Sequence, residues 1–98
     1  MKTYIPEYNE YPEETSNPFS TISKTIRNIP KKFPKVKAIV KKPQGQAAGI
    51  ELSSTDEEQL KKAFITLCYD NGEEHYNELV ANGKLEDELE SMDFYAWN

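Results

Sequence analysis

The chain has 98 residues, of which 37% are hydrophobic and 30% charged, and its formal net charge at pH 7 is −5. A chain of this length encloses one hydrophobic core, so we expect a single small domain of modest stability. Its longest apolar run, residues 63–69, is interrupted once and is far shorter than the roughly 20 residues of a membrane span; no stretch resembles the apolar core of a signal peptide. The single cysteine, Cys68, excludes an internal disulfide, and these features together predict a soluble, cytoplasmic protein.

The opening segment, residues 1–17, is rich in tyrosine and proline and nearly free of aliphatic side chains. Neither the helical nor the strand period is visible in it, so we predict an extended arm. Three tyrosines, Tyr4, Tyr8 and Tyr11, offer large contact area at low entropic cost. The arm is therefore expected to lie over the protein's own sheet, to fray, or to bind a partner in an extended form.

Asn17 and Pro18 have the residue types of a helix N-cap and first turn, because an N–H would be unpaired at the first turn and proline has none. We predict a short helix over residues 18–28 that ends before Pro30, since proline disrupts a helix interior. Its apolar face would consist of Phe19, Ile22 and Ile26.

Residues 35–42 alternate between apolar and polar side chains, which is the period of a half-buried strand. A turn at residues 43–46 leads to a second alternating segment at residues 48–52, so the two segments are expected to form an antiparallel hairpin. The inward side chains would be Val36, Ala38 and Val40 on the first strand, and Ala48, Ile50 and Leu52 on the second.

A helix is predicted to begin at Ser54 or Thr55, ahead of three acids that suit the positive end of the helix dipole, and to run to about Tyr69. Gly72 would end it by adopting the left-handed conformation. One helical face collects the apolar residues of this segment. The predicted buried stripe is Leu60, Ala63, Phe64, Leu67 and Cys68.

Two shorter helices are predicted at residues 73–81 and 85–92, and Asn82 with Gly83 would end the first of them. The second is followed by an aromatic segment, whose burial the pattern leaves open. The side chains expected to pack inward are Tyr76, Leu79, Val80, Leu85, Leu89 and Met92.

These elements predict an α+β fold in which an N-terminal arm and a short helix precede a hairpin, and two to three C-terminal helices cover one face of the sheet. The arm would occupy residues 1–17 and a single α+β domain residues 18–98. A two-stranded sheet is marginal by itself, so a third strand from the arm or from a partner would complete it.

The sequence contains no recognisable set of residues for catalysis or for metal binding. The only histidine, His75, has no recognisable nucleophile beside it, and Cys68 falls on a predicted buried stripe, where a thiol is usually inert. His75 and Glu78 can share a helix face, but no metal-ligand motif matches them. The four glycines stand at turn and helix-end positions instead of in a phosphate-binding loop. We therefore predict no enzyme, no catalytic residues, no metal and no cofactor.

The charges are divided along the chain. Residues 21–50 carry eight Lys and Arg and no acid, whereas residues 51–98 carry 13 Asp and Glu against three Lys. Such a division indicates what the protein attracts and repels, although it says little about the fold. It offers two candidate binding surfaces of opposite sign.

The acidic C-terminal half is the first candidate. Carboxylates on packed helices could imitate nucleic-acid phosphates and occupy a groove lined with Lys and Arg, while exposed aromatics would serve as buried anchors. The alternative is a solvated face whose charge keeps the protein soluble. The predicted partner-binding residues are Asp70, Glu73, Glu74, Glu78, Glu86, Asp87, Glu88, Glu90, Asp93, Tyr95 and Trp97.

The lysine-rich block is the second candidate, because lysines on a strand face could follow a phosphate backbone. Against it, the acidic half would repel nucleic acid over about a Debye length, ~10 Å at 0.1 M salt. The lysines could equally pair with the chain's own acids or protect an edge strand. This alternative surface comprises Lys31, Lys32, Lys35, Lys37, Lys41 and Lys42.

The leading hypothesis is a small non-enzymatic inhibitor or regulator that binds a basic, nucleic-acid-handling protein or complex through its acidic helical half. In size, charge division, tyrosine-rich arm and lack of catalytic groups, the chain resembles in type the accessory proteins of phages and mobile elements, such as anti-restriction and anti-CRISPR inhibitors. The resemblance is one of type, because no motif assigns the chain to a family and none identifies site residues by comparison. The alternative hypothesis is an accessory protein that binds nucleic acid directly through the lysine-rich strand. No membrane partner is expected.

Overall fold

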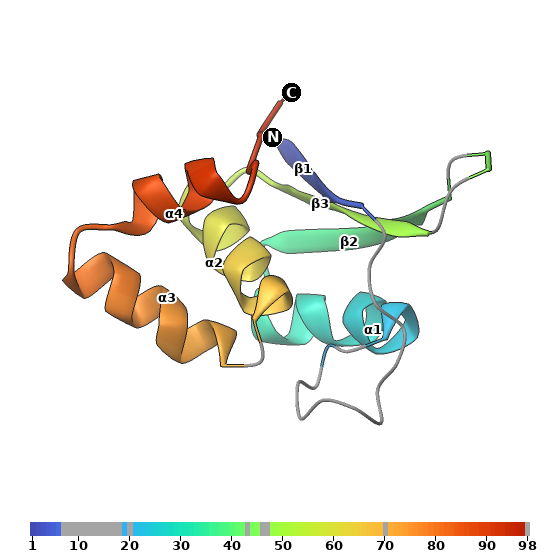
Figure 1. Cartoon of the computed structure of the whole chain (residues 1–98). Helices are drawn as coiled ribbons and strands as arrows, with labels where there is room; N and C mark the ends of the chain where they lie inside the picture. Colours follow the sequence, from blue (N-terminus) through green and yellow to red (C-terminus); the bar gives the residue numbers. More distant parts are fainter. Residues whose placement is uncertain (7–18, 20, 43, 46–47, 70, 98) are drawn as a thin grey trace.

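A three-stranded antiparallel sheet with helices packed on one side forms the centre of the computed structural model (Figure 1). The structure describes residues 1–6, 19, 21–42, 44–45, 48–69 and 71–97. Its elements are β1 (Lys2–Ile5), α1 (Ile22–Lys32), β2 (Val36–Lys41), β3 (Gly49–Ser54), α2 (Glu57–Cys68), α3 (Gly72–Ala81) and α4 (Leu85–Ser91). This arrangement confirms the predicted α+β class. In these ranges, no helix combines the length and the apolar character that crossing a membrane requires.

The strand β3 lies in the middle of the sheet and pairs antiparallel with β1 and β2. Because β1 comes from the start of the predicted arm, the third strand is supplied by the chain itself. Thr3 and Ala38 both face Leu52, one from each side, so these three side chains point toward the helices. The rest of the arm, residues 7–18 with the predicted Asn17 helix start, lies outside the described residues.

The C-terminal segment pairs with the outer edge of β1. The backbone N–H of Lys2 donates to the Trp97 carbonyl at 2.6 Å, and the Trp97 N–H donates to the Lys2 carbonyl at 2.9 Å. Figure 1 shows the two ends of the chain side by side at this point. β1 therefore has backbone partners on both of its edges.

The bounds of α1 differ from the prediction. It spans Ile22–Lys32 instead of residues 18–28 and contains Pro30, so the prediction that this proline ends the helix is wrong. Proline removes one hydrogen bond from the last turn. Ile29 and Phe33 are buried where α1 packs against β2, and this packing holds the turn in helical form.

The helix α2 is buried on two sides. Four residues of its predicted stripe are buried, but Cys68 is exposed, which corrects the expectation for that residue. Ile65 and Thr66 are buried in addition, because α3 and α4 cover the side of α2 that faces away from the sheet. Cys68 is the last residue of α2 and is covered neither by the sheet nor by α3 and α4. The confirmed stripe residues are Leu60, Ala63, Phe64 and Leu67.

The glycines at the two ends of α3 are required for different reasons, close packing at Gly72 and backbone conformation at Gly83. The prediction that Gly72 ends α2 in the left-handed conformation is wrong, because Gly72 is the first residue of α3 and its φ is not positive. A Cβ on Gly72 would lie 2.3 Å from the Thr66 Cα. Its lack of a side chain lets α3 approach the backbone of α2. Gly83, with φ of +68°, ends α3 as predicted, and the Lys84 N–H donates to the Leu79 carbonyl in the accompanying turn.

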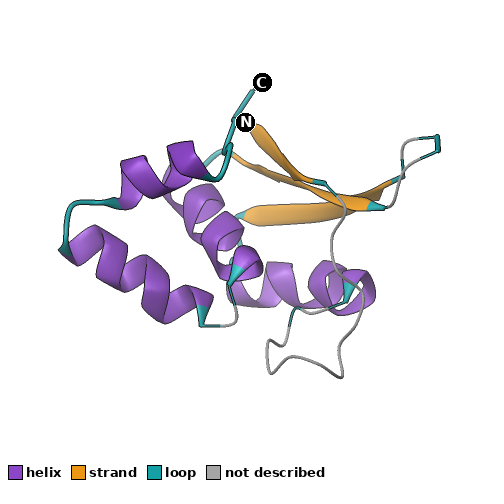
Figure 2. Ribbon diagram, viewed as in Figure 1, coloured by secondary structure: helices purple, strands orange, loops and turns teal. Residues whose placement is uncertain are grey.

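Two apolar clusters lie on either side of α2. The first fills the space between the sheet, α1 and α2, and the second lies between α2, α3 and α4. Phe94 packs against both and meets Phe64 edge to face, with 5.0 Å between ring centroids. Val40 was expected inside but is 47% exposed; it lies on the edge strand β2, opposite the buried Ile50. Figure 2 shows the described helices on one side of the sheet, with none on the other.

Candidate functional site

The two halves of the charge pattern lie on different parts of the fold. Most of the C-terminal acids belong to α3 and α4, which lie beyond α2 from the sheet, whereas the strand lysines belong to β2 (Figure 1). The predicted acidic and basic surfaces are therefore separate, and each can be assessed by which of its charges are already paired.

Five acids on α3, on α4 and directly after α4 are exposed. The carboxylates of α3 and α4 that form ion pairs are Glu73, Glu86 and Glu88. The five exposed acids therefore have no cationic partner among the described residues. We call this set the acidic surface. It consists of Glu74, Glu78, Asp87, Glu90 and Asp93.

Two other predicted acids hold the helices together. Glu73 meets Lys32 of α1 at 2.7 Å and Lys62 of α2 at 4.0 Å, and the contact with Lys32 keeps the pKa of Glu73 below its ordinary value. Glu86 meets Lys61 at 2.9 Å, and this contact raises the pKa of Lys61. These carboxylates are less available to a partner than those of the acidic surface.

Glu88 faces the interior of the α2, α3 and α4 layer. It accepts a hydrogen bond from the Tyr69 hydroxyl, which raises the pKa of Tyr69 to about 12, and its carboxylate lies 3.7 Å from Nε2 of His75. The Tyr69 and His75 rings are 4.2 Å apart between centroids. The cluster fastens α4 to the end of α2 and the start of α3. Asp70, another predicted acid, lies outside the described residues.

A hollow of about 350 Å³ opens between α2, α3 and α4. Its apolar lining includes Val80, which is 51% exposed, although the sequence pattern had placed it inside. Acidic side chains line the hollow next to these apolar atoms, so it offers both an apolar surface and negative charge. It is lined by Glu57, Glu58, Lys61, Tyr76, Val80, Leu85 and Glu86.

Tyr95 and Trp97 lie beyond α4, apart from the acids on α3 and α4. Trp97 pairs with Lys2 in β1, and its ring stacks with that of Tyr95 at a centroid distance of 6.4 Å. The two aromatics predicted as anchors of an acidic interface therefore lie beside the sheet. Phe94 and Ala96, which alternate with them, pack against the core.

The six predicted lysines do not form one patch. Lys31 and Lys32 occupy the last turn of α1, where cations suit the helix dipole, on the helical side of the sheet. Lys37 and Lys41 alternate with the inward residues of β2 and lie on the sheet's other face. Lys42 follows β2 and is exposed.

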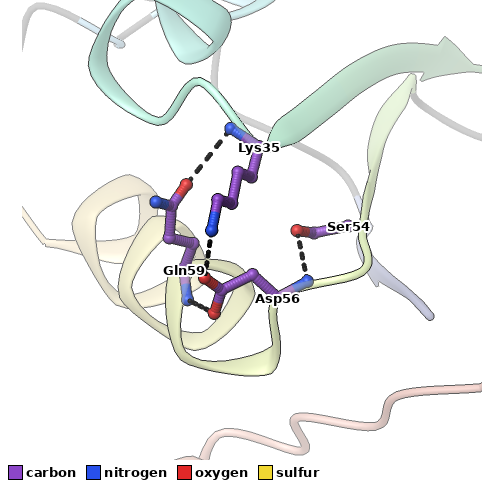
Figure 3. A network of polar contacts seen from close by, with 4 residues as sticks. All are labelled: Lys35, Ser54, Asp56 and Gln59. Carbon is purple, nitrogen blue, oxygen red and sulfur yellow. Dashed lines mark hydrogen bonds and ion pairs between the residues drawn. The ribbon is translucent and has the colours of Figure 1, made fainter.

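Lys35 is tied to the start of α2 (Figure 3). Its N–H donates to Oε1 of Gln59 at 3.2 Å, and its Nζ lies 3.5 Å from Oδ2 of Asp56. Asp56, and not Ser54 or Thr55, is the N-cap of α2: its side chain accepts the Gln59 N–H at 3.1 Å, which is the main reason that the pKa of Asp56 is lowered. Ser54 supports the cap by accepting the Asp56 N–H.

The described residues contain no group of three or more His, Cys, Asp or Glu side chains placed to hold a metal ion. Cys68 is exposed at the end of α2, yet its neighbours exclude enough water from the sulfur to raise the thiol pKa to about 11. At neutral pH such a thiol is almost entirely protonated, and a protonated thiol is a poor nucleophile.

Cys68 should therefore react slowly with an alkylating reagent despite its exposure. At pH 8 we expect a rate about 100-fold below that of a cysteine peptide, because a pKa near 11 instead of 9.0 leaves about 100-fold less thiolate. The rate of iodoacetamide labelling, followed by mass spectrometry from pH 7 to about 11, measures this directly. A rate that levels off near pH 9 would contradict the desolvation of the thiol.

Sequence reasoning named the arm as one source of a third strand but did not place that strand at Lys2–Ile5. Lys2 and Tyr4 alternate with the buried Thr3 and the half-buried Ile5, the strand pattern that would have revealed β1 had the segment been longer. It also missed the hollow beside Val80, for which local periodicity gives no signal.

A scan against protein-family models, a search of curated proteins and a search of solved structures found no match to this chain.

Proposed function

We propose that this protein is a non-enzymatic inhibitor or regulator, of the kind that phages and mobile elements encode, which binds a basic nucleic-acid-handling protein in the cytoplasm. The observation that supports this best is the acidic surface, whose five carboxylates have no cationic partner among the described residues. The helices that carry it are packed on the core, so binding requires little ordering of this part of the chain. Opposite charge on the partner would speed encounter and fix its orientation.

The hollow beside the acidic surface adds an apolar contact that charge by itself does not provide. A lysine or arginine of the partner fits its chemistry, because the methylene stem can pack on Val80 and Leu85 while the cationic head meets Glu58, which has no ion pair with a described residue. This apolar contact would replace the one that the sequence analysis expected from Tyr95 and Trp97. Its lining residues come from three helices, so the site depends on how they pack.

Nucleic-acid mimicry is the mechanism we propose for inhibition. Glu74 and Glu78 are four residues apart on α3, and Asp87 and Glu90 are three residues apart on α4, so each pair lies on one helix face. Rows of fixed carboxylates on neighbouring helices present negative charge at regular intervals, as a phosphate backbone does. A protein groove that binds phosphates through Lys and Arg would accept them.

The test is affinity capture from the native host's lysate at about 0.15 M salt, with and without nuclease, followed by direct binding to the partner that mass spectrometry identifies. We expect a basic protein that survives nuclease treatment. The variant E74K/E78K/D87K/E90K should bind it about 100-fold more weakly, because like charges placed together across an interface cost several kcal/mol.

The matched control reverses charge on the sheet, in K37E/K41E, and should leave binding to the same partner within a factor of about 3. Recovery of nucleic acid only, lost on nuclease treatment, would contradict the proposal. So would a partner that the acidic-surface variant binds as tightly as the wild-type chain does.

A further inference from the structure

The face of the sheet that turns away from the helices carries aromatic and basic side chains together. Residues opposite each other in an antiparallel pair point to the same face, and so do alternate residues along one strand. The register and the bridge between Lys2 and Trp97 place six aromatic and basic side chains on one side, which we call the open sheet face and which also carries the exposed Ile39. They are Lys2, Tyr4, Lys37, Lys41, Tyr95 and Trp97.

Tyr95 and Trp97 form an aromatic platform at one edge of this face. Trp97 shares the side of its pairing partner Lys2, and Tyr95, two residues earlier, follows by alternation. The two rings are inclined by only 25° to each other, and Tyr95 and Trp97 are 73% and 37% exposed. Their position is fixed from below, because Phe94 and Ala96 pack against the core.

Tyr4 continues the aromatic surface toward the middle of the sheet. A Cβ at Gly49 would lie 2.3 Å from the Tyr4 Oη and 2.6 Å from its Cζ, so the ring lies across Gly49 on the open sheet face. Gly49 pairs with Lys41 in β2. The absence of a side chain at Gly49 thus lets Tyr4 lie flat beside the lysines.

The charge of this face is positive. Lys2 and Lys41 share the buried carboxylate of Glu51, at 3.8 Å and 3.6 Å, while Lys37 has no ion pair with a described residue. Three lysines against one acid leave an excess of cations around the tyrosines and the tryptophan. The side chains of Lys2 and Lys41 remain about half exposed, at 50% and 52%.

A hollow of about 540 Å³ lies at the end of β3 that adjoins this face. Lys2, Lys35 and Lys37 line it together with Ser53, Ser54 and Thr55. Ammonium and hydroxyl groups in a shallow hollow are donors suited to phosphate and sugar oxygens.

We propose that the open sheet face binds single-stranded nucleic acid, with bases stacked on Trp97, Tyr95 and Tyr4 and the phosphate backbone beside Lys37, Lys41 and Lys2. Stacking on aromatic side chains beside a basic groove is how proteins hold single strands without reading their sequence. A duplex hides its base faces, so it would gain the lysine contacts alone. An acidic protein segment would likewise leave the stacked rings unused.

The acidic surface does not prevent this binding. Four of its five acids lie on α3 and α4, and only Asp93, two residues before Tyr95, is close to the aromatic platform. Repulsion between exposed charges is screened beyond about 8 Å at physiological salt. The proposal uses different residues from the proposed protein interface, so either one can fail without the other.

Trp97 is the single tryptophan of the chain and reports on its own surroundings. The experiment titrates the full-length protein with three probes, namely an oligothymidine single strand, a duplex of the same length and a polyglutamate peptide, and follows Trp97 fluorescence. We expect quenching by the single strand, at least about 10-fold weaker binding of the duplex, and no quenching by polyglutamate. The logarithm of affinity should fall with the logarithm of salt concentration with a slope of about −2, as expected for roughly three phosphate contacts.

Three variants separate stacking from charge. Tyr95→Ala keeps the Trp97 reporter and should weaken binding by about 5-fold or more, and K37E/K41E should weaken it by at least about 10-fold and flatten the salt slope. Glu51→Gln should strengthen binding several-fold, because it removes the acid that Lys2 and Lys41 share. The acidic-surface variant E74K/E78K/D87K/E90K is the control, and its affinity should change less than that of K37E/K41E.

Equal affinity for single strand and duplex, or unchanged affinity in Tyr95→Ala with its melting temperature preserved, would overturn the stacking proposal. Saturable quenching by polyglutamate would assign the face to an acidic protein instead. No quenching by any probe, in a protein whose circular dichroism confirms folding, would also overturn it.

Discussion

A Gly72→Ala variant should lose about 3 kcal/mol of unfolding free energy, the upper part of the usual range for forcing atoms into a packed interior. The new Cβ would lie 2.3 Å from the Thr66 Cα, 2.6 Å from the Thr66 carbonyl oxygen and 2.8 Å from the Ile65 carbonyl oxygen. All three are backbone atoms of α2, so no side-chain rotation can relieve the contact. α3 would have to move away and open the second apolar cluster. Urea denaturation followed by far-UV circular dichroism measures the loss.

Gly83→Ala is the matched control at the other end of α3. A Cβ there meets nothing within 4 Å, but φ is +68°, so the expected cost is the left-handed backbone alone, about 1 to 2 kcal/mol. Gly72→Ala should therefore be the less stable of the two. If it were as stable as the wild-type chain, α3 would have to lie farther from α2 than the structure places it.

This close approach of α3 to α2 matters for the proposed function. Glu73 follows Gly72 directly and reaches Lys32 at 2.7 Å, so a shift of α3 would break that ion pair. It would also change the shape of the hollow beside Val80. A single position therefore links the packing of α2 and α3 to the arrangement of the acidic surface.

Local patterns were enough to predict the hairpin and the three C-terminal helices. Alternation in β2 and β3 and the helical spacing of residues such as Leu60 and Phe64 are properties of short stretches, and Gly83 ends α3 for a local reason. The prediction for α1 failed where packing mattered more than propensity. Burial of Ile29 and Phe33 keeps the last turn helical although it contains Pro30.

The candidate sites were predictable in composition but not in arrangement. The sequence shows which residues are charged, whereas the pairing of Glu73 with Lys32 and of Lys35 with Asp56 depends on contacts between distant elements. The same holds for Trp97. Its place beside the lysines follows from a hydrogen-bonded pair with Lys2, at the opposite end of the chain, which no local period can reveal.

Charge and aromatic side chains are thus distributed differently from the sequence-based hypothesis. Five carboxylates on or just after the acidic helices have no cationic partner among the described residues, and the hollow with Val80 in its lining lies between these helices and α2. Tyr95 and Trp97 instead lie beside the lysines of the open sheet face. Two surfaces of opposite sign on one small fold suit two ligands of opposite sign. A protein that binds a basic nucleic-acid enzyme with one and a single strand with the other could act on both at the same time. Reversing charge on one surface at a time separates the two activities.

A Phe94→Ala variant should lose about 2 to 3 kcal/mol of unfolding free energy, somewhat below the range for a fully buried phenylalanine because Phe94 is half-buried. Phe94, like Ile5, packs against both apolar clusters, and its ring meets Phe64 with 5.0 Å between centroids. Its removal should also release the segment that carries Tyr95 and Trp97. We therefore expect a red shift of Trp97 emission before global unfolding, together with weaker binding of the oligothymidine strand.

Phe94→Leu is the conservative control, since it keeps most of the apolar volume and should cost less than about 1.5 kcal/mol. In that variant the Trp97 emission and the oligonucleotide affinity should stay close to the wild-type values. The informative contrary result is a Phe94→Ala protein that is destabilised but keeps both properties. The backbone pair between Lys2 and Trp97 would then be sufficient to hold the aromatic platform against β1, and the core beneath it would contribute stability without positioning the site.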